Sequence, residues 1–491
     1  MKKIAVIGSG FAGLTSAIEL ASLGYQVTVF EKNSTLGGRA RKFETNGFTF
    51  DMGPSWYWMP DVFDKFFARH GKKVGDYYNL LKLDPGFSVV YGKDNTIDVP
   101  ASLDELVDLF ENIEKGSGSR LKKFLKKAAI KYNIGMDSLV YKPSHSIFEF
   151  FNLKVLIGVL YLDVFSNFRS YVKKYFSDSR LTRLMEFPVL FLGATPQNTP
   201  ALYSLMNYSA FSQGTFYPMG GFHEIIIGLS KLAKEKGVTI NCDSNVDRLN
   251  IVNGNVENVV VNGEKLFFDG IIASADYHHV EQKLLDKPFR NYSTEYWDKR
   301  EMSPSSLLFY VGVDKRLNNL QHHNLFFDAD FDQHAKEIYD NPKWPKNPLF
   351  YLSCPSITDS SLAPKGNENL MFLIPLAPGL EDTNEMREKY FDIVLKRLKD
   401  LTGNDIEKNI IFKKSYCVND FEKDYNSFKG NAYGLANTLR QTAVLKPRMR
   451  NKKIKNLYYT GQLTVPGPGV PPSIISGQIA AIEIDKYLNK L

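Results

Sequence analysis

The sequence predicts an α/β protein that opens with a parallel strand–helix–strand unit. Three observations predict it: an apolar run at residues 4–7, a glycine-rich turn directly after it, and a helical pattern at 13–23 that leads to a β-branched run at 26–30. In this order the glycine turn lies at the carboxyl end of the first strand and at the start of the helix. The unit is the first half of a Rossmann-like fold.

The turn has the spacing that brings backbone close to phosphate, and it comprises Gly8, Gly10, Phe11, Ala12 and Gly13. Gly8 allows the tight turn, Gly10 lets the backbone approach a pyrophosphate, and Gly13 lets helix and strand pack closely. The free N–H groups of the helix N-terminus favour the phosphates. We therefore predict a dinucleotide site here.

An acidic residue ends the second strand. Glu31 lies 18 residues after Gly13 and is followed by Lys32. A carboxylate at this place accepts hydrogen bonds from ribose hydroxyls and repels a 2′-phosphate. A glycine turn without a ligand is the alternative, but it leaves the position of Glu31 unexplained.

Composition restricts the class of protein. The 491 residues suggest two or three domains, and the net charge of +7 is too small for a nucleic-acid protein but suits weak attraction to an anionic membrane. The three cysteines have no metal-ligand spacing and favour a reducing compartment. Only residues 1–3 precede the first strand, and no run of about 20 apolar residues occurs, so we expect a cytoplasmic chain without a cleaved signal or a spanning helix.

Later segments resemble further parts of the same fold, so we expect interleaved domains. Residues 224–236 predict a helix and 238–242, 256–261 and 271–273 predict strands, with hairpin turns at Asn253-Gly254 and Asn262-Gly263. A last strand is expected at 457–460, and a helix from Ser473. The expected domains are a discontinuous dinucleotide domain at 1–75, 215–285 and 445–491, a mostly helical region at 76–214, and a mixed-sheet substrate domain at 286–444.

Three downstream motifs decide which dinucleotide is bound. The segments 36–39, 51–55 and 456–462 resemble the extended motif of the flavin amine oxidase and phytoene desaturase superfamily. The resemblance implies FAD and a chain that returns to the flavin near its C-terminus. The further cofactor residues that it implies are Gly38, Arg39, Gly53, Pro54, Ser55, Val246, Gly461, Val470 and Pro471. No second GxGxxG occurs, so a separate nicotinamide domain is not expected.

Other segments narrow the resemblance to the bacterial carotenoid (phytoene-type) desaturases. They are 51–56, 217–221, 353–364, 461–471 and the pair His322-His323. The chain departs from that family's usual residues at Tyr459, Gln462 and Leu463. The resemblance implies a C40 hydrocarbon substrate, phytoene desaturated toward lycopene, held in a dry aromatic tunnel while the flavin takes a hydride.

Several alternatives stay open at this point. Within the superfamily they are a carotenoid isomerase, a later-step desaturase or an amine oxidase, and outside enzymes a prenyl-lipid carrier. The catalytic base and the electron acceptor are not indicated, although His322 and His323 match the family. Residues 353–364 suit a structural loop as well as a substrate site.

A membrane surface is the second expected partner. Residues 120–132 predict an amphipathic helix with a basic face, namely Arg120, Lys123, Lys127 and Lys131, opposite an apolar face. Residues 147–168 are apolar and aromatic but interrupted by charges, which suits an interfacial segment. An ordinary surface helix followed by a core helix is the alternative. We expect peripheral attachment without spanning.

Overall fold

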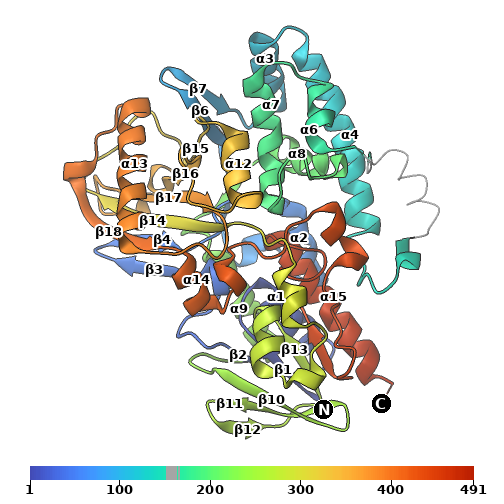
Figure 1. Ribbon diagram of the computed structural model, residues 1–491. Coiled ribbons are helices and arrows are strands. Elements are labelled where there is room, and N and C mark those ends of the chain that lie inside the picture. The colour runs from blue at the N-terminus through green and yellow to red at the C-terminus, as the bar shows by residue number, and fades with distance from the viewer. Residues whose placement is uncertain (151–162, 164–165, 491) are drawn as a thin grey trace.

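Two large sheets and a helical region build the protein. The computed structural model describes residues 1–150, 163 and 166–490. Figure 1 shows a parallel sheet with both termini at the bottom, a larger sheet at the left and the helical region at the upper right. The two ends of the chain are in contact, because Lys2 Nζ donates to the carbonyl of Leu488.

The parallel sheet confirms the predicted strand–helix–strand unit. Its strand order is β19-β13-β1-β2-β9. The strands are β1 (Lys3–Ile7), β2 (Gln26–Phe30), β9 (Thr239–Asn241), β13 (Gly270–Ala273) and β19 (Leu457–Tyr459). The helices α1 (Phe11–Ser22), α9 (Glu224–Glu235) and α15 (Val470–Leu488) accompany them, and α1 packs against the other two. Segments from the start, middle and end of the chain thus meet around the glycine turn.

A small antiparallel sheet follows β9 and confirms both predicted hairpins. It comprises β10 (Val246–Val252), β11 (Asn255–Val261) and β12 (Glu264–Leu266). Both residues of each connecting turn, Asn253-Gly254 and Asn262-Gly263, have positive φ angles. This is the turn geometry that matches strand twist in two-residue hairpins.

The second large sheet contains both parallel and antiparallel strand pairs. Its order is β18-β14-β17-β16-β15-β6-β7, with β6 and β15 parallel and the other neighbours antiparallel. The strands are β6 (Phe87–Gly92), β7 (Asn95–Val99), β14 (Ser305–Val313), β15 (His323–Phe326), β16 (Phe350–Ser353), β17 (Glu368–Leu376) and β18 (Ile410–Tyr416). Every residue of β14 is buried: Leu307 and Phe309 share a core with α13 (Asn384–Thr402), whereas Leu308 faces the other side.

The remaining elements connect these layers. The two-stranded pairs are β3 (Lys42–Thr45) with β4 (Phe48–Asp51), and β5 (Leu80–Lys82) with β8 (Phe216–Pro218). The other α-helices are α2 (Pro60–Arg69), α3 (Leu103–Ile113), α4 (Ser117–Ser138), α6 (Phe168–Lys173), α7 (Ser179–Glu186), α8 (Leu205–Tyr208), α10 (Tyr277–His279), α11 (Thr294–Asp298), α12 (Phe331–Tyr339) and α14 (Val418–Tyr425). Short 3₁₀ and π turns include η1 (Gly38–Ala40), η4 (Phe187–Leu192) and η5 (Ala201–Ser204).

The structure corrects the predicted extent of the helical region. Residues 80–99, expected to be mostly helical, form β5, β6 and β7 instead. Strand β6 pairs with β15, more than 200 residues away in the sequence, with Asn324 opposite Ser88. A partner so distant leaves no local signal, and only the β-branched run at 87–99 could have indicated strands.

The predicted amphipathic helix exists as α4, but its faces differ from the prediction. The apolar residues are all buried in the core: Leu121, Phe124, Leu125, Ala128 and Tyr132. Lys131 is buried as well, where Nζ donates to Ala201 O and Ser204 Oγ and pairs with Asp163. The apolar face therefore stabilises the fold and is not free for a membrane. Most of the predicted interfacial segment 147–168 lies outside the described residues.

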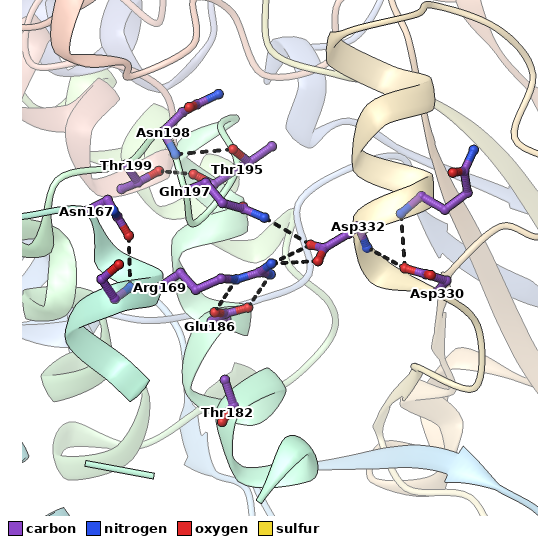
Figure 2. Close-up of polar contacts among 12 residues, drawn as sticks. Asn167, Arg169, Thr182, Glu186, Thr195, Gln197, Asn198, Thr199, Asp330 and Asp332 are labelled. Carbon is purple, nitrogen blue, oxygen red and sulfur yellow. Dashed lines mark hydrogen bonds and ion pairs between the residues drawn. The ribbon is translucent and has the colours of Figure 1, made fainter. Parts of the chain in front are cut away.

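A charge network joins the helical region to α12 (Figure 2). Arg169 of α6 donates twice to the Glu186 carboxylate at 2.7 Å, and its Nη1 lies 2.6 and 2.7 Å from the carboxylate oxygens of Asp332 on α12. Gln197 donates a further bond to Asp332, and Asp330 caps the first turn of α12. One guanidinium thus joins α6, α7 and α12.

A second charged group, the carboxylate of Glu19, joins the helices beside the parallel sheet. Glu19 of α1 accepts from Arg69 on α2 and from Gln478 on α15. Burial opposes its ionisation, but bonds from His70, Arg69 and Gln478 prevail and lower its pKa to about 2. The charged form stabilises the fold above pH 4.5, and that contribution is lost as the pH falls through about 2.

We therefore expect Glu19→Ala to lower the free energy of unfolding by about 2–3 kcal/mol at pH 7 and by less at pH 3. Urea unfolding of both proteins at the two pH values measures the difference. An equal loss at both would show that the charge of Glu19 does not contribute.

Candidate functional site

A cavity of about 470 Å³ runs from the glycine turn of the parallel sheet to the mixed sheet. Every predicted cofactor residue except Gly13 lines it: Gly8, Gly10, Phe11, Ala12, Glu31, Lys32, Gly38, Arg39, Gly53, Pro54, Ser55, Val246, Gly461, Val470 and Pro471. Residues from five distant segments therefore surround one space. We call this part the dinucleotide end.

The glycine turn is built as its motif predicts. Gly8 has a φ of +99°, which favours glycine. A Cβ at Gly13 would lie 2.0 Å from the carbonyl oxygen of Gly8, so Gly13 sets the close packing of helix on strand rather than touching the cavity. A Cβ at Gly10 would meet no protein atom within 4 Å, and Gly10 lines the cavity, so a ligand has room to approach the backbone there.

Two helix N-termini open into the dinucleotide end. Gly10 precedes α1 and Gly469 precedes α15, and neither helix has a side-chain cap. The uncapped N–H groups and helix dipoles offer two places for negatively polarised oxygens. α15 begins at Val470, three residues before the predicted Ser473. Two separated anion sites in one elongated space fit a dinucleotide.

Two charged residues of the dinucleotide end, Glu31 and Lys32, already have hydrogen-bond partners within the protein. Glu31 accepts four bonds, from the backbone N–H and the side chains of Ser9 and Asn33. Lys32 donates to the Lys423 carbonyl and to Asn426. A ribose hydroxyl that binds Glu31, as predicted, would therefore share this carboxylate with Ser9 and Asn33.

Arg39 is the best-placed cation for a phosphate group. Its Nη2 donates to Ser427 Oγ and Asn431 O at 3.1 Å, and its buried Nε has no partner among the described residues. Burial lowers its pKa, and Asp276 opposes that shift. An unpartnered N–H in a buried guanidinium is ready to bind an anion.

The other end of the cavity is an apolar arm. It comprises Trp56, Trp58, Met59, Phe187, Leu190, Leu192, Thr195, Met206, Ser306, Leu308, Leu325, Phe327, Phe331, His334, Ile338, Tyr339, Leu349, Phe350, Tyr351, Leu373 and Tyr433. No Asp, Glu, Lys or Arg is among the described residues that line this arm. The family resemblance implied a dry aromatic tunnel, but the sequence did not show which residues line it, because they come from unconnected strands and turns.

The family-matched histidines do not reach the cavity. His322 and His323 are buried behind its wall, and burial lowers the pKa of His322 to about 3. Residues 353–364 do not line it either: Asp359 accepts from Gly220 N at 2.7 Å. The structural alternative for 353–364 therefore fits this loop better than a substrate contact.

Three comparisons with known proteins agree with this geometry. The family model for flavin containing amine oxidoreductases matches residues 11–485. The chain belongs to this family. It is 40% identical to a carotenoid 3,4-desaturase of Haloarcula japonica over 97% of both chains, and 32% identical to a 4,4′-diapophytoene desaturase (4,4′-diaponeurosporene-forming) of Staphylococcus haemolyticus, again over 97% of both. An oxidoreductase structure from Methanosarcina mazei shares the fold, with a TM-score of 0.63, 17% identity, and coverage of 98% of this chain and 100% of that one.

The chain is thus an FAD-dependent oxidoreductase in the carotenoid desaturase group of this family. The two uncapped helix termini, the open space beside Gly10 and the unpartnered Arg39 Nε fit FAD. No group of His, Cys, Asp and Glu within the described residues is arranged to hold a metal ion. No helix in the same part of the chain is long and apolar enough to cross a membrane.

A pair of substitutions tests the dinucleotide end. We expect Arg39→Ala and Glu31→Ala each to weaken FAD binding by about 1.5–3 kcal/mol, because each removes a charged hydrogen-bonding group. Titration of the flavin-free proteins with FAD measures the change. Asp286→Ala, which removes an exposed ion pair with Arg248, serves as a control. Wild-type affinity in both variants would place the flavin elsewhere.

Proposed function

We propose that the protein is a carotenoid desaturase that removes two hydrogens from a carbon–carbon bond of a C40 polyene. The observation that carries the proposal is the apolar arm, which continues from the dinucleotide end of the cavity. No charged side chain is among the described residues that line it. A hydrocarbon has no polar groups that need hydrogen-bond partners, so it can be buried against such apolar walls without cost. Bound FAD supplies hydride acceptance. The residues of the dinucleotide end hold the cofactor, and the arm aligns the polyene and excludes water.

We propose two candidate substrates, and we rank a later-step carotenoid before phytoene. The greater identity to a carotenoid 3,4-desaturase supports a later step, 3,4-desaturation of an already unsaturated C40 carotenoid. Desaturation of phytoene toward lycopene, which the sequence motifs alone favoured, is the second candidate. Both reactions lengthen the conjugated system.

Expression in cells that accumulate lycopene, and separately in cells that accumulate phytoene, tests the proposal. A desaturase gives a product that is lighter by two hydrogens and absorbs at longer wavelength. An isomerase changes the spectrum without changing the mass, and a carrier changes neither. An unchanged carotenoid pool in both hosts, with folded and flavin-loaded protein present, would contradict the proposal.

We also propose that the protein takes its substrate from a membrane surface, because a C40 hydrocarbon is held in lipid. Exposed lysines occur on α4 and at the C-terminal end of α6: Lys122, Lys123, Lys126, Lys127, Lys173 and Lys174. Ile130 on α4 is 42% exposed, and Phe148, ten residues beyond the end of α4, is 78% exposed. These groups suit contact with an anionic bilayer.

We expect Lys123→Glu/Lys126→Glu to weaken flotation with anionic liposomes, since each lysine near such a surface contributes about 1 kcal/mol. Lys389→Glu/Lys396→Glu on α13 is the matched control, because it makes the same change in net charge at exposed positions. Equal flotation of the two variants would show that these lysines of α4 do not contribute to membrane binding.

A further inference from the structure

The hydroxyl group of Tyr351 lies where the dinucleotide end of the cavity meets the apolar arm. Tyr351 and Ser55 both line the cavity, and their hydroxyl oxygens are 3.0 Å apart. The same Tyr351 oxygen is 2.6 Å from Nδ1 of His323 on the neighbouring strand. His323 is fully buried and stacks on Trp56 at 4.2 Å. These contacts form a hydrogen-bonded chain from the cavity to a buried imidazole.

Desaturation releases a proton as well as a hydride, and the cavity offers few groups that could take it. The carboxylates among its described lining residues are all at the dinucleotide end and already committed. Glu31 accepts four bonds, Asp276 caps α10 beside Arg39, and Asp424 pairs with Arg41. None of them belongs to the apolar arm.

The two histidines that line the cavity are no better placed. His334 accepts from Leu349 N through Nδ1 and donates to the Pro375 carbonyl through Nε2, so both ring nitrogens are occupied. His279 follows Asp276 at the dinucleotide end, where Lys32 adds a positive charge. Hydroxyl groups remain, and Tyr351 is the one that bonds to an imidazole.

We propose that Tyr351 takes up the proton released from the substrate carbon while passing its own phenolic proton to His323. The inference rests on the proposed desaturase function. In this step the carbon–hydrogen bond breaks, and its electron pair becomes the second bond of the new double bond. An oxygen–hydrogen bond forms at Tyr351, and a nitrogen–hydrogen bond forms at Nδ1 of His323.

The surroundings of His323 suit a brief acceptor. Burial, aided by His322, holds its pKa well below the ordinary value, so the ring is neutral, and Nδ1 can accept in the tautomer that carries the proton on Nε2. The same burial makes the charged ring short-lived: the proton returns to Tyr351, which passes a hydroxyl proton to Ser55 while Ser55 gives its own hydroxyl proton to a water molecule in the chamber beside it. Ser55 lines this separate chamber of about 20 Å³ together with Asp51 and His322, and it has room for about one water molecule.

The test follows product formation in a single turnover, through the absorbance of the lengthened polyene. It uses flavin-loaded protein and liposomes that contain lycopene or phytoene, whichever the wild type converts. We expect Tyr351→Phe to form product about 100-fold more slowly or worse, the scale of a lost proton-transfer group. We expect His323→Gln to be slowed as well. Wild-type turnover should be slower in deuterium oxide, and both variants should lose this solvent effect.

Tyr390→Phe is the matched control, because it also removes the hydroxyl of a buried tyrosine, which donates to the Pro345 carbonyl, but Tyr390 does not line the cavity. It should keep the wild-type rate and solvent effect. A wild-type rate in Tyr351→Phe would overturn the proposal, and so would a wild-type protein without a solvent effect, even if both variants failed to fold. A wild type that converts no carotenoid would instead contradict the proposed function.

Discussion

We expect Gly10→Val to abolish FAD binding and leave the fold intact. Gly10 has an extended backbone, with φ −69° and ψ −178°, that valine readily adopts. Its Cβ would meet no protein atom within 4 Å, so the new side chain occupies the space that the motif reserves for the pyrophosphate. Loss of this close approach should weaken binding by at least about 100-fold, or about 2.7 kcal/mol. Flavin absorbance of the purified protein and titration with FAD measure it.

Gly92→Val is the matched control for this substitution. Gly92 ends β6, has no protein atom within 4 Å of its Cβ position, and does not line the cavity. We expect this variant to bind FAD like the wild type. If Gly10→Val also kept its flavin and its melting temperature, the phosphates could not lie against this turn.

The dinucleotide end was predictable because its signals are local. The turn at Gly8, Gly10 and Gly13 depends on backbone space, which only a glycine sequence supplies, and Glu31 follows at the distance set by one helix and one strand. The hairpin turns at Asn253-Gly254 and Asn262-Gly263 are local as well.

The family resemblance implied an aromatic tunnel, but the residues of the apolar arm could not be predicted, because nothing in the sequence relates them. Leu308, Leu325 and Leu373 belong to three strands whose order in the sheet differs from their order in the chain. A leucine that lines a cavity looks like any core leucine. Tyr351 likewise gains its contacts with Ser55 and His323 only through strand pairing and packing.

Lys131 shows how a periodic pattern misleads. It recurs with Arg120, Lys123 and Lys127 on one helical face, which predicted a basic face turned away from the core. The turn η5 covers the last part of that face and supplies Ala201 O and Ser204 Oγ as acceptors. The periodicity of a sequence shows which residues share a helical face, but it does not show that another segment, here η5, packs on that face.

Arg169→Ala should cause the largest loss of stability, about 3–5 kcal/mol. The substitution leaves Glu186, whose side chain is 1% exposed, without the guanidinium that donates to both of its oxygens (Figure 2). Asp332 is 49% exposed and can be hydrated, so Asp332→Asn should cost less than about 1 kcal/mol. Urea unfolding of both variants tests this ranking.

The pH dependence identifies the cause of the loss. Burial already raises the pKa of Glu186 although Arg169 lowers it, and without Arg169 the folded-state pKa rises further above the unfolded value of 4.5. A carboxyl group with a raised folded-state pKa destabilises the fold increasingly as the pH rises past its unfolded value. The cost of Arg169→Ala should therefore be greater at pH 8 than at pH 5. Arg169→Leu/Glu186→Leu, which removes both charges, should recover most of the loss, and a double variant as unstable as Arg169→Ala would show that the packing of Arg169, not the stranded charge, holds α6, α7 and α12 together.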